Sequence, residues 1–196
     1  MGLNVFAMLH PLGKTIVAPP AWMLNREFDD GLGNMLRLVK HHTPSTGVAV
    51  SAGSPVGFTA AFSDGSVTTD FSQSKGGKLA GMSMIAITLA ETFAALTWAW
   101  VMTKGHPVDY IAGGRGVPLG DANFNPNVNP ITSIKTNDSV ADGDLLVWAV
   151  DDTWSGVTEP LDGQTGGGIA LADDGGVAMA PADVVINVGQ GMGVTP

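Results

Sequence analysis

The sequence predicts an all-β protein: an antiparallel β-barrel or sandwich of short strands, with an extended N-terminal arm and little helix. One observation behind this is that 27 glycines and 12 prolines are spread along the 196 residues. A second is that the runs between them are short and rich in Val, Ile, Thr, Phe and Trp, which fit a pleated surface. A third is that turn sequences such as Asp-Gly separate these runs.

Residues 1–46 form a distinct opening segment, which we expect to run as an arm over a surface. Four prolines interrupt it, and each proline pushes the preceding residue out of the helical region. Within it, Asn34–His41 (NMLRLVKH) is expected to form one or two helical turns with Asn34 as the cap. The alternative is that the segment is an ordinary edge strand and loop of the same domain.

Residues 47–120 carry the clearest strand pattern and form the predicted core of the β-domain. The expected strands are Gly47–Val50, Val56–Phe62, Lys78–Ile87, Thr97–Thr103 and Val108–Ala112, with turns at Gly53–Pro55 and Ser63–Ser66. Thr88 and Glu91 match a capping box, so a helix over Ala90–Leu96 is an alternative. A strand, a loop and a strand are favoured there because the flanking sequence is β-rich.

Residues 121–138 are rich in Asn and Pro and are expected to form a linker or a long loop. Residues 139–196 form a second, acidic β-rich part that completes the same domain, with one or two barrels both possible. The strands expected there are Asp144–Val150, Gly168–Ala172, Val177–Ala180 and Val184–Val188.

The low content of charged residues indicates that the protein assembles with other chains. Only 14% of the residues are charged and 44% are apolar, which excludes a disordered chain. Charged residues are depleted in the cores of interfaces, so the shortage indicates a surface covered by neighbouring chains. Residues 1–115 carry eight basic and seven acidic side chains, a net charge of +1, whereas residues 116–196 carry one and eleven, a net charge of −10. The acidic half repels phosphate backbones, so no nucleic-acid partner is expected.

No membrane partner is expected either. Met82–Met102 is the one span long enough to cross a bilayer, and it contains Glu91, whose charge would be costly there. The N-terminal sequence has no basic residue before its apolar stretch and does not resemble a secretory signal.

The motifs that usually carry chemistry are incomplete. The chain has no cysteine, which excludes disulfides, thiol nucleophiles and cysteine metal sites. Gly13-Lys14-Thr15 resembles the end of a phosphate-binding loop, but Met8 stands where the leading glycine is required. Gly114-Arg115-Gly116 has its next glycine one residue late for a dinucleotide site, and Pro118 blocks the helix that should follow.

Metal and catalytic patterns are also missing. The four histidines lack ligand spacing, and the pairs Asp151-Asp152 and Asp173-Asp174 are interpreted as turn residues. No Gly-x-Ser-x-Gly nucleophile motif occurs. The sequence therefore predicts no catalytic, cofactor-binding or metal-binding residue, no cofactor and no enzymatic activity. A hydrolase with an aspartate-based site is kept as a third hypothesis.

The tryptophans suggest contact residues. Trp98, Trp100 and Trp148 lie inside strand runs and are expected in the core, whereas Trp22 and Trp154 lie in looser sequence. Tryptophan and arginine are enriched among residues that dominate binding energy. The predicted partner-contact residues are Trp22, Arg26, Phe28, Arg37, Lys40 and Trp154.

Two segments carry a family resemblance. Lys78–Met82 (KLAGM) leads to Thr97–Asp109 (TWAWVMTKGHPVD), in which a Trp-Val pair is followed by Thr and Gly. This arrangement is similar to small β-rich structural proteins of tailed-bacteriophage virions, especially capsid decoration (cement) and head-fibre-like proteins. Ala99 stands where that family usually has a glycine.

The resemblance implies a non-enzymatic protein that binds the major capsid protein and stabilises the assembled shell. It also implies a location on the capsid surface of the virion, after assembly in the host cytoplasm. Low charge and the predicted arm are compatible with a homo-oligomer, a dimer or a trimer. The alternative function is a carbohydrate-binding or host-attachment β-module that uses exposed tryptophans.

Overall fold

The fold was analysed in a computed structural model, which describes residues 19, 21–23, 26–29, 33–41, 50–59, 66–85, 98–107, 136, 140–159, 166–171 and 184–188. Ten strands and two short 3-10 helices lie in these ranges, so the chain is all-β as predicted. The strands are β1 (Glu27–Asp29), β2 (Met35–His41), β3 (Pro55–Thr59), β4 (Ser66–Thr68), β5 (Ser74–Ser83), β6 (Trp98–Gly105), β7 (Leu145–Val150), β8 (Thr153–Val157), β9 (Gly166–Ala170) and β10 (Val184–Asn187). The 3-10 helices are η1 (Ala21–Met23) and η3 (Phe71–Gln73).

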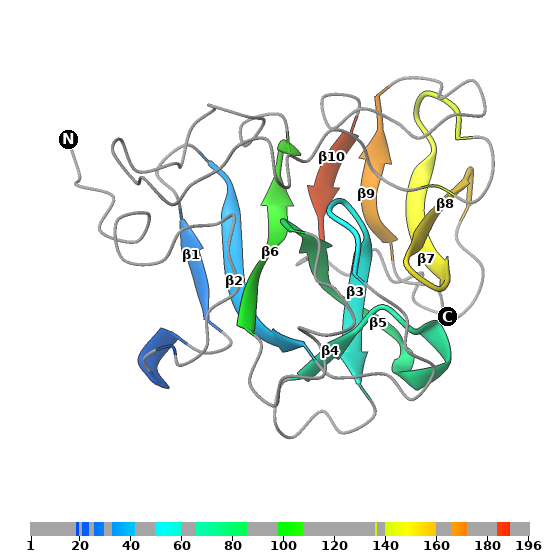
Figure 1. Cartoon of the computed structure of the whole chain (residues 1–196). Helices are drawn as coiled ribbons and strands as arrows, with labels where there is room; N and C mark the ends of the chain where they lie inside the picture. The colour runs from blue at the N-terminus through cyan, green and yellow to red at the C-terminus, as the bar shows by residue number, and fades with distance from the viewer. Residues whose placement is uncertain are drawn as a thin grey trace.

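Five of the strands close into a barrel (Figure 1). The order is β2-β4-β3-β5-β6, and the pairing of β2 with β6 completes the ring. The β2–β4 pair is parallel, and the other pairs in the ring are antiparallel. The longest of these pairings runs from Met35 opposite Lys104 to Lys40 opposite Trp98, with a register shift between Met35 and Leu36. Closure removes the exposed strand edges that an open sheet would leave.

The remaining strands extend from the barrel in two directions. At the end of β6, Gly105 pairs with Ile186 of β10, and the sheet continues through β9 and β7 to β8. These four strands are antiparallel to one another. On the other side, β1 pairs with β2. Figure 1 shows β1 and β8 at opposite ends of the molecule.

Two tryptophans on β7 and β8 join the four-stranded sheet to the barrel. Trp148 and Trp154 are cross-strand partners, and both are buried. The Trp148 ring lies against Gly57 of β3, where a Cβ would collide with it. The Trp154 indole Nε1 donates a hydrogen bond of 2.8 Å to the carbonyl of Gly53. The absence of a side chain at Gly57 thus leaves the space that the Trp148 ring fills.

A short turn on the barrel strengthens this junction. Phe71 of η3 packs edge-to-face on Trp148, with 5.2 Å between ring centroids. The backbone N–H of Phe71 donates to the Asp151 carboxylate at 2.7 Å, and the N–H of Asp152 donates to the carbonyl of Thr69 at 2.9 Å. The β7–β8 turn is therefore fixed to the barrel by both side chains and backbone.

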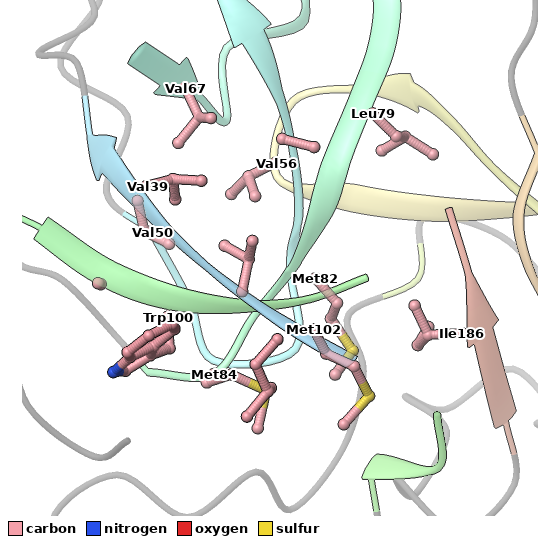
Figure 2. Packing of buried hydrophobic residues seen from close by; sticks show 14 of the residues in the cluster. Val39, Val50, Val56, Val67, Leu79, Met82, Met84, Trp100, Met102 and Ile186 are labelled. Carbon is pink, nitrogen blue, oxygen red and sulfur yellow. The ribbon is translucent and has the colours of Figure 1, made fainter. Parts of the chain in front are cut away.

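The core runs through the barrel and into the junction. Figure 2 shows side chains from β2, β3 and β4 meeting inside the barrel, among them Val39, Val56 and Val67. Met82 and Met102, which are partners across β5 and β6, lie beside each other in the same view. Flexible thioethers fill irregular space of this kind.

The prediction of helical turns at Asn34–His41 is wrong, because Met35–His41 form the strand β2. The apolar residues that suggested a helix face also suit a strand that is buried on both sides, and pairing with β6 decides between the two. Asn34 caps no helix. Its side-chain oxygen instead accepts a hydrogen bond of 3.0 Å from the backbone N–H of His106, which ties the start of β2 to the end of β6.

Most of the other strand predictions that fall on described residues are confirmed with shifted ends. Strands β3, β5, β6, β7, β9 and β10 correspond to predicted runs, whereas β1, β4 and β8 were not predicted. Ser66 begins β4, so the predicted turn does not extend to it. Both described strands of the opening segment belong to the same sheet as the rest. Residues 42–49, 60–65, 86–97, 108–135 and 172–183, which include several predicted elements, lie outside the described residues.

Gly57→Ala is expected to destabilise the fold by about 1–3 kcal/mol, because the added methyl group meets the Trp148 ring and lies 2.8 Å from the carbonyl of Lys78. Urea unfolding measures the change. The same substitution in a Trp148→Phe background should cost less, since the smaller ring leaves room. An equal cost in both backgrounds would contradict this packing.

Candidate interaction surface

A ladder of three aromatic rings leads from the surface to the core at one end of the sheet. Trp22 of η1 packs edge-to-face on Phe28 of β1, with centroids 6.0 Å apart. Phe28 packs in the same way on Trp100 of β6, with centroids 5.8 Å apart. Trp100 is fully buried, Phe28 is half-buried and Trp22 is 54% exposed. The indole of Trp22 is therefore presented to solvent on a fixed support.

The register of β1 and β2 builds this ladder. Phe28 lies opposite Leu36, and Trp100 lies opposite Leu38 two residues further along β2. Residues two apart in a strand share a face, so Phe28 lies on the same face as Trp100. The exposed Arg26 directly precedes β1. We call Trp22, Arg26 and Phe28 the aromatic end.

Arg37 lies next to this end but on the opposite face of the β1–β2 pair. It is the cross-strand partner of Glu27, and its Nη2 donates a hydrogen bond of 2.7 Å to the Glu27 carboxylate. Its guanidinium also lies 5.8 Å from the centroid of the Phe58 ring. Partly exposed ion pairs of this kind stabilise a fold by less than about 1 kcal/mol. Lys40 lies further along β2, opposite Trp98 and Ser66.

The six predicted contact residues thus fall into three groups. Trp22 and Phe28 are in contact at the aromatic end, and exposed Arg26 lies two residues before Phe28. Arg37 lies on the opposite face of β2 from Phe28, and Lys40 lies near the end of β2 that pairs with β4. Trp154 lies in the junction with the barrel and is 0% exposed, so its prediction as an exposed contact residue is wrong.

The physical reason for this error is a tight turn. Asp152 adopts a left-handed conformation with φ of 47°, which aspartate tolerates. The turn folds Thr153–Val157 back as β8 beside β7, and this places Trp154 opposite Trp148. The loose sequence around Trp154 is therefore a hairpin strand. Asp151 and Asp152 are turn residues, as predicted.

A second apolar surface was not predicted. Val185, Ile169, Leu145 and Val157 are successive cross-strand partners across β10, β9, β7 and β8. We call these four residues the apolar row. Ile169 is 41% exposed, and Leu171, which follows it on the same side, is 47% exposed. The sequence signal was the alternation in Ile169-Ala170-Leu171, where the small middle residue faces the core.

Three described aspartates, Asp70, Asp144 and Asp151, accept hydrogen bonds from backbone N–H groups. The Asp70 carboxylate accepts hydrogen bonds from the N–H of Ser72 at 2.9 Å and from its hydroxyl at 2.6 Å, and so caps η3. Asp144 accepts a hydrogen bond of 3.0 Å from the N–H of Ala141 within a turn. Among the described residues, no three His, Asp or Glu side chains gather as a metal site would require.

His41, the last residue of β2, is a buried titratable group. Neither ring nitrogen has a hydrogen-bond partner within the described part of the chain. Burial disfavours the charged imidazolium and lowers the pKa of His41 from 6.5 to about 4. The ring is therefore neutral at physiological pH and is part of the packed interior.

No known protein family, curated protein or solved structure matches the chain. The helices in the described ranges are all too short or too polar to cross a bilayer. The aromatic end and the apolar row, which are the two exposed apolar surfaces, are therefore the basis for a proposed function.

Trp154→Phe is expected to lower the free energy of unfolding by about 1–3 kcal/mol more than Trp148→Phe. Both substitutions shorten a buried ring, but only the first removes a hydrogen bond and leaves the Gly53 carbonyl without its donor. The Trp148 Nε1 has no acceptor among the described residues, which makes it the matched control. Chemical denaturation compares the two, and equal losses would contradict a role for this hydrogen bond.

Stability should fall as the pH drops from 6.5 towards 4. In that interval the unfolded chain binds a proton at His41 that the folded chain excludes, so the free energy of unfolding decreases by about 3 kcal/mol in total. Denaturant unfolding at pH 7 and pH 5 measures the slope, above the range in which ordinary carboxylates titrate. His41→Leu should flatten it, and an unchanged slope in that variant would contradict the assignment.

Proposed function

We propose that this chain is a non-enzymatic structural protein of a virion, which binds the major capsid protein and stabilises the assembled capsid. The observation that carries the proposal is the aromatic end, where edge-to-face contacts from the core through Phe28 support an exposed tryptophan. Tryptophan and arginine are the residues that most often dominate protein–protein binding energy. The low charge content of the chain supports the same conclusion, because interface cores are poor in charge.

The fixed position of the Trp22 ring favours a role in binding another protein. The edge-to-face contacts with Phe28 and Trp100 restrict the Trp22 ring before any partner arrives. A side chain that is already ordered loses less conformational entropy on binding. Burial of the indole against a shell subunit therefore yields more net affinity than burial of a mobile side chain of the same size.

Stabilisation of the shell follows from multiple contacts. A decoration protein that touches more than one subunit converts later contacts into intramolecular ones, which raises the overall affinity without any new chemistry. Removal of one subunit then requires several contacts to break at once. In this proposal the chain resides on the capsid surface as a homo-oligomer, and the capsid protein is its main partner.

A second candidate function is carbohydrate binding or host attachment. The observation that favours it is the same exposed indole, because a flat aromatic face can stack on a pyranose ring. The first function requires the indole to bind a protein surface, and the second requires it to bind a sugar. Quenching of tryptophan fluorescence by a soluble glycan at millimolar concentration, lost in Trp22→Ser, would favour the second candidate.

The proposed function is tested by binding to shells assembled from the cognate major capsid protein. Trp22→Ser should weaken co-sedimentation with these shells about 30-fold, the factor that corresponds to about 2 kcal/mol lost at a dominant contact residue. Lys78→Ser, at an exposed position on β5, is the matched control and should bind as the native chain does. A native chain that never binds shells would overturn the proposal.

A further inference from the structure

The outer face of the sheet formed by β7 to β10 exposes a group of apolar side chains. On β9, Ile169 and Leu171 alternate with buried Ala170, and they are 41% and 47% exposed. Among the described residues, Trp22 is the one other large apolar side chain that is exposed. The remaining members of the apolar row are half-buried: Val185, Leu145 and Val157. Clustered apolar side chains that stay exposed usually mark an interaction site.

The described residues of this sheet carry negative charge and no positive charge. In residues 140–159, 166–171 and 184–188, the charged side chains are Asp142, Asp144, Asp151, Asp152 and Glu159. Asp144, Asp151 and Asp152 are half-buried, whereas Asp142 and Glu159 are exposed. Asp142 and Glu159 are therefore the carboxylates of this sheet that are most accessible to a partner.

Both exposed carboxylates lie at the same end of these strands as Leu171. The N–H of Gly143 donates a hydrogen bond of 3.0 Å to the carbonyl of Ala170, which holds the turn that contains Asp142 next to Leu171. Glu159 lies two residues after β8, and β8 ends opposite the start of β7, which directly follows this turn. The exposed apolar side chains are therefore bordered by negative charge on one side.

The neighbouring positive charge lies at the other end of the strands. Lys104 of β6 is exposed and pairs with Asn187, the last residue of β10. Ala170, which precedes Leu171, pairs instead with Val184, the first residue of β10. Lys104 is therefore separated from the acidic border by the length of β10 and does not neutralise it.

The acidic border decides which kind of partner fits this surface. Two copies of the surface facing each other would bring carboxylates together, and like charges across an interface are unfavourable. Anionic lipids and nucleic acids would be repelled for the same reason. A protein segment that has Lys or Arg beside apolar side chains gains from apolar burial and from charge pairing at once.

We propose that the apolar row and Leu171 bind a segment of the major capsid protein in which apolar side chains are bordered on one side by Lys or Arg. The inference rests on the proposed function in taking the capsid protein as the partner. It adds a second contact surface to the aromatic end and states the chemistry that this surface recognises.

Two separate surfaces on one chain also explain how the shell is stabilised. Figure 1 shows β1 and the strands β7 to β10 at opposite ends of the molecule, so the aromatic end and the apolar row contact the shell at different places. Each surface is small and its contact is weak by itself. Linked in one chain, the two contacts reinforce each other because the second forms at a high effective concentration.

The test begins with the free chain and a peptide probe, so that it does not depend on shells. The probe is a short fluorescent peptide in which alternating leucine and threonine precede a run of lysines. Two comparison peptides replace its leucines by serine or its lysines by glutamate. Fluorescence anisotropy measures binding over a series of protein concentrations up to about 1 mM, where weak complexes are populated.

Two variants each remove one feature of the surface. The row variant combines Ile169→Thr with Leu171→Ser and keeps a strand-forming residue in β9. The charge variant combines Asp142→Asn with Glu159→Gln and leaves the apolar side chains in place. Trp22→Ser and Asp29→Asn, which change exposed residues at the aromatic end, are the matched controls. Circular dichroism checks that every variant keeps its β-structure.

The native chain and both controls should bind the lysine peptide equally, with a Kd below about 1 mM. The row variant should bind it about 10-fold more weakly, because the apolar contact is lost. The charge variant should bind it about 3-fold more weakly, as expected for exposed ion pairs, and about 500 mM salt should remove that difference. The serine and glutamate peptides should each bind the native chain at least about 10-fold more weakly.

Three results with the peptide would overturn the inference: no binding to the native chain, equal binding to the row variant, or equal binding of the lysine and glutamate peptides. Co-sedimentation with shells then tests the partner, and the row variant should bind shells about 10-fold more weakly than the native chain. Shell binding that is unchanged in the row variant would overturn the inference and leave the proposed function. A native chain that binds the peptide and ignores shells would overturn the proposed function, and with it the capsid protein as the occupant of this surface.

Discussion

The pairing of β2 with β6 organises both the barrel and the sheet that extends from it. It closes the barrel, and its register places Trp100 where Phe28 and then Trp22 can stack outward. The same β6 continues past the barrel and pairs with β10, which starts the four-stranded sheet. One strand therefore supports both exposed apolar surfaces. A change that separated β2 from β6 would disturb the barrel and the aromatic end together.

The two exposed apolar surfaces differ in the charges beside them. At the aromatic end, exposed Arg26 is accompanied on β1 by exposed Glu27 and Asp29, whereas exposed Asp142 and Glu159 lie near the apolar row. Some polar side chains among the described residues stabilise turns of the fold, as the Asp151 and Asp70 contacts do. Trp22, Ile169 and Leu171 are large apolar side chains that stay exposed, and they are the basis of the proposed interaction role.

The sequence was sufficient for the fold class and for the strands with long apolar runs, such as β6 and β7. The sequence was not sufficient where contacts between distant segments decide which of two local conformations a segment adopts. The spacing of Met35, Leu38 and Val39 suits a helix face, yet β2 is a strand because it pairs with β6 along one edge and with β1 and β4 along the other. The sequence predicted an exposed Trp154 because nothing in it marks Asp152 as the left-handed residue of a tight turn. The apolar row could not be predicted, because its members are distant in sequence and become neighbours only through the register of the strands.

Hydroxyl-radical footprinting of side chains, on the free chain and on the chain bound to shells, tests whether the exposed apolar side chains are contact surfaces. We expect Trp22, Ile169 and Leu171 to react readily in the free chain and to become protected in the assembly, while exposed Lys78 changes little. Equal reactivity of Trp22, Ile169 and Leu171 in the free and bound chains would contradict the claim that these exposed apolar side chains are the contact surfaces of an assembling protein.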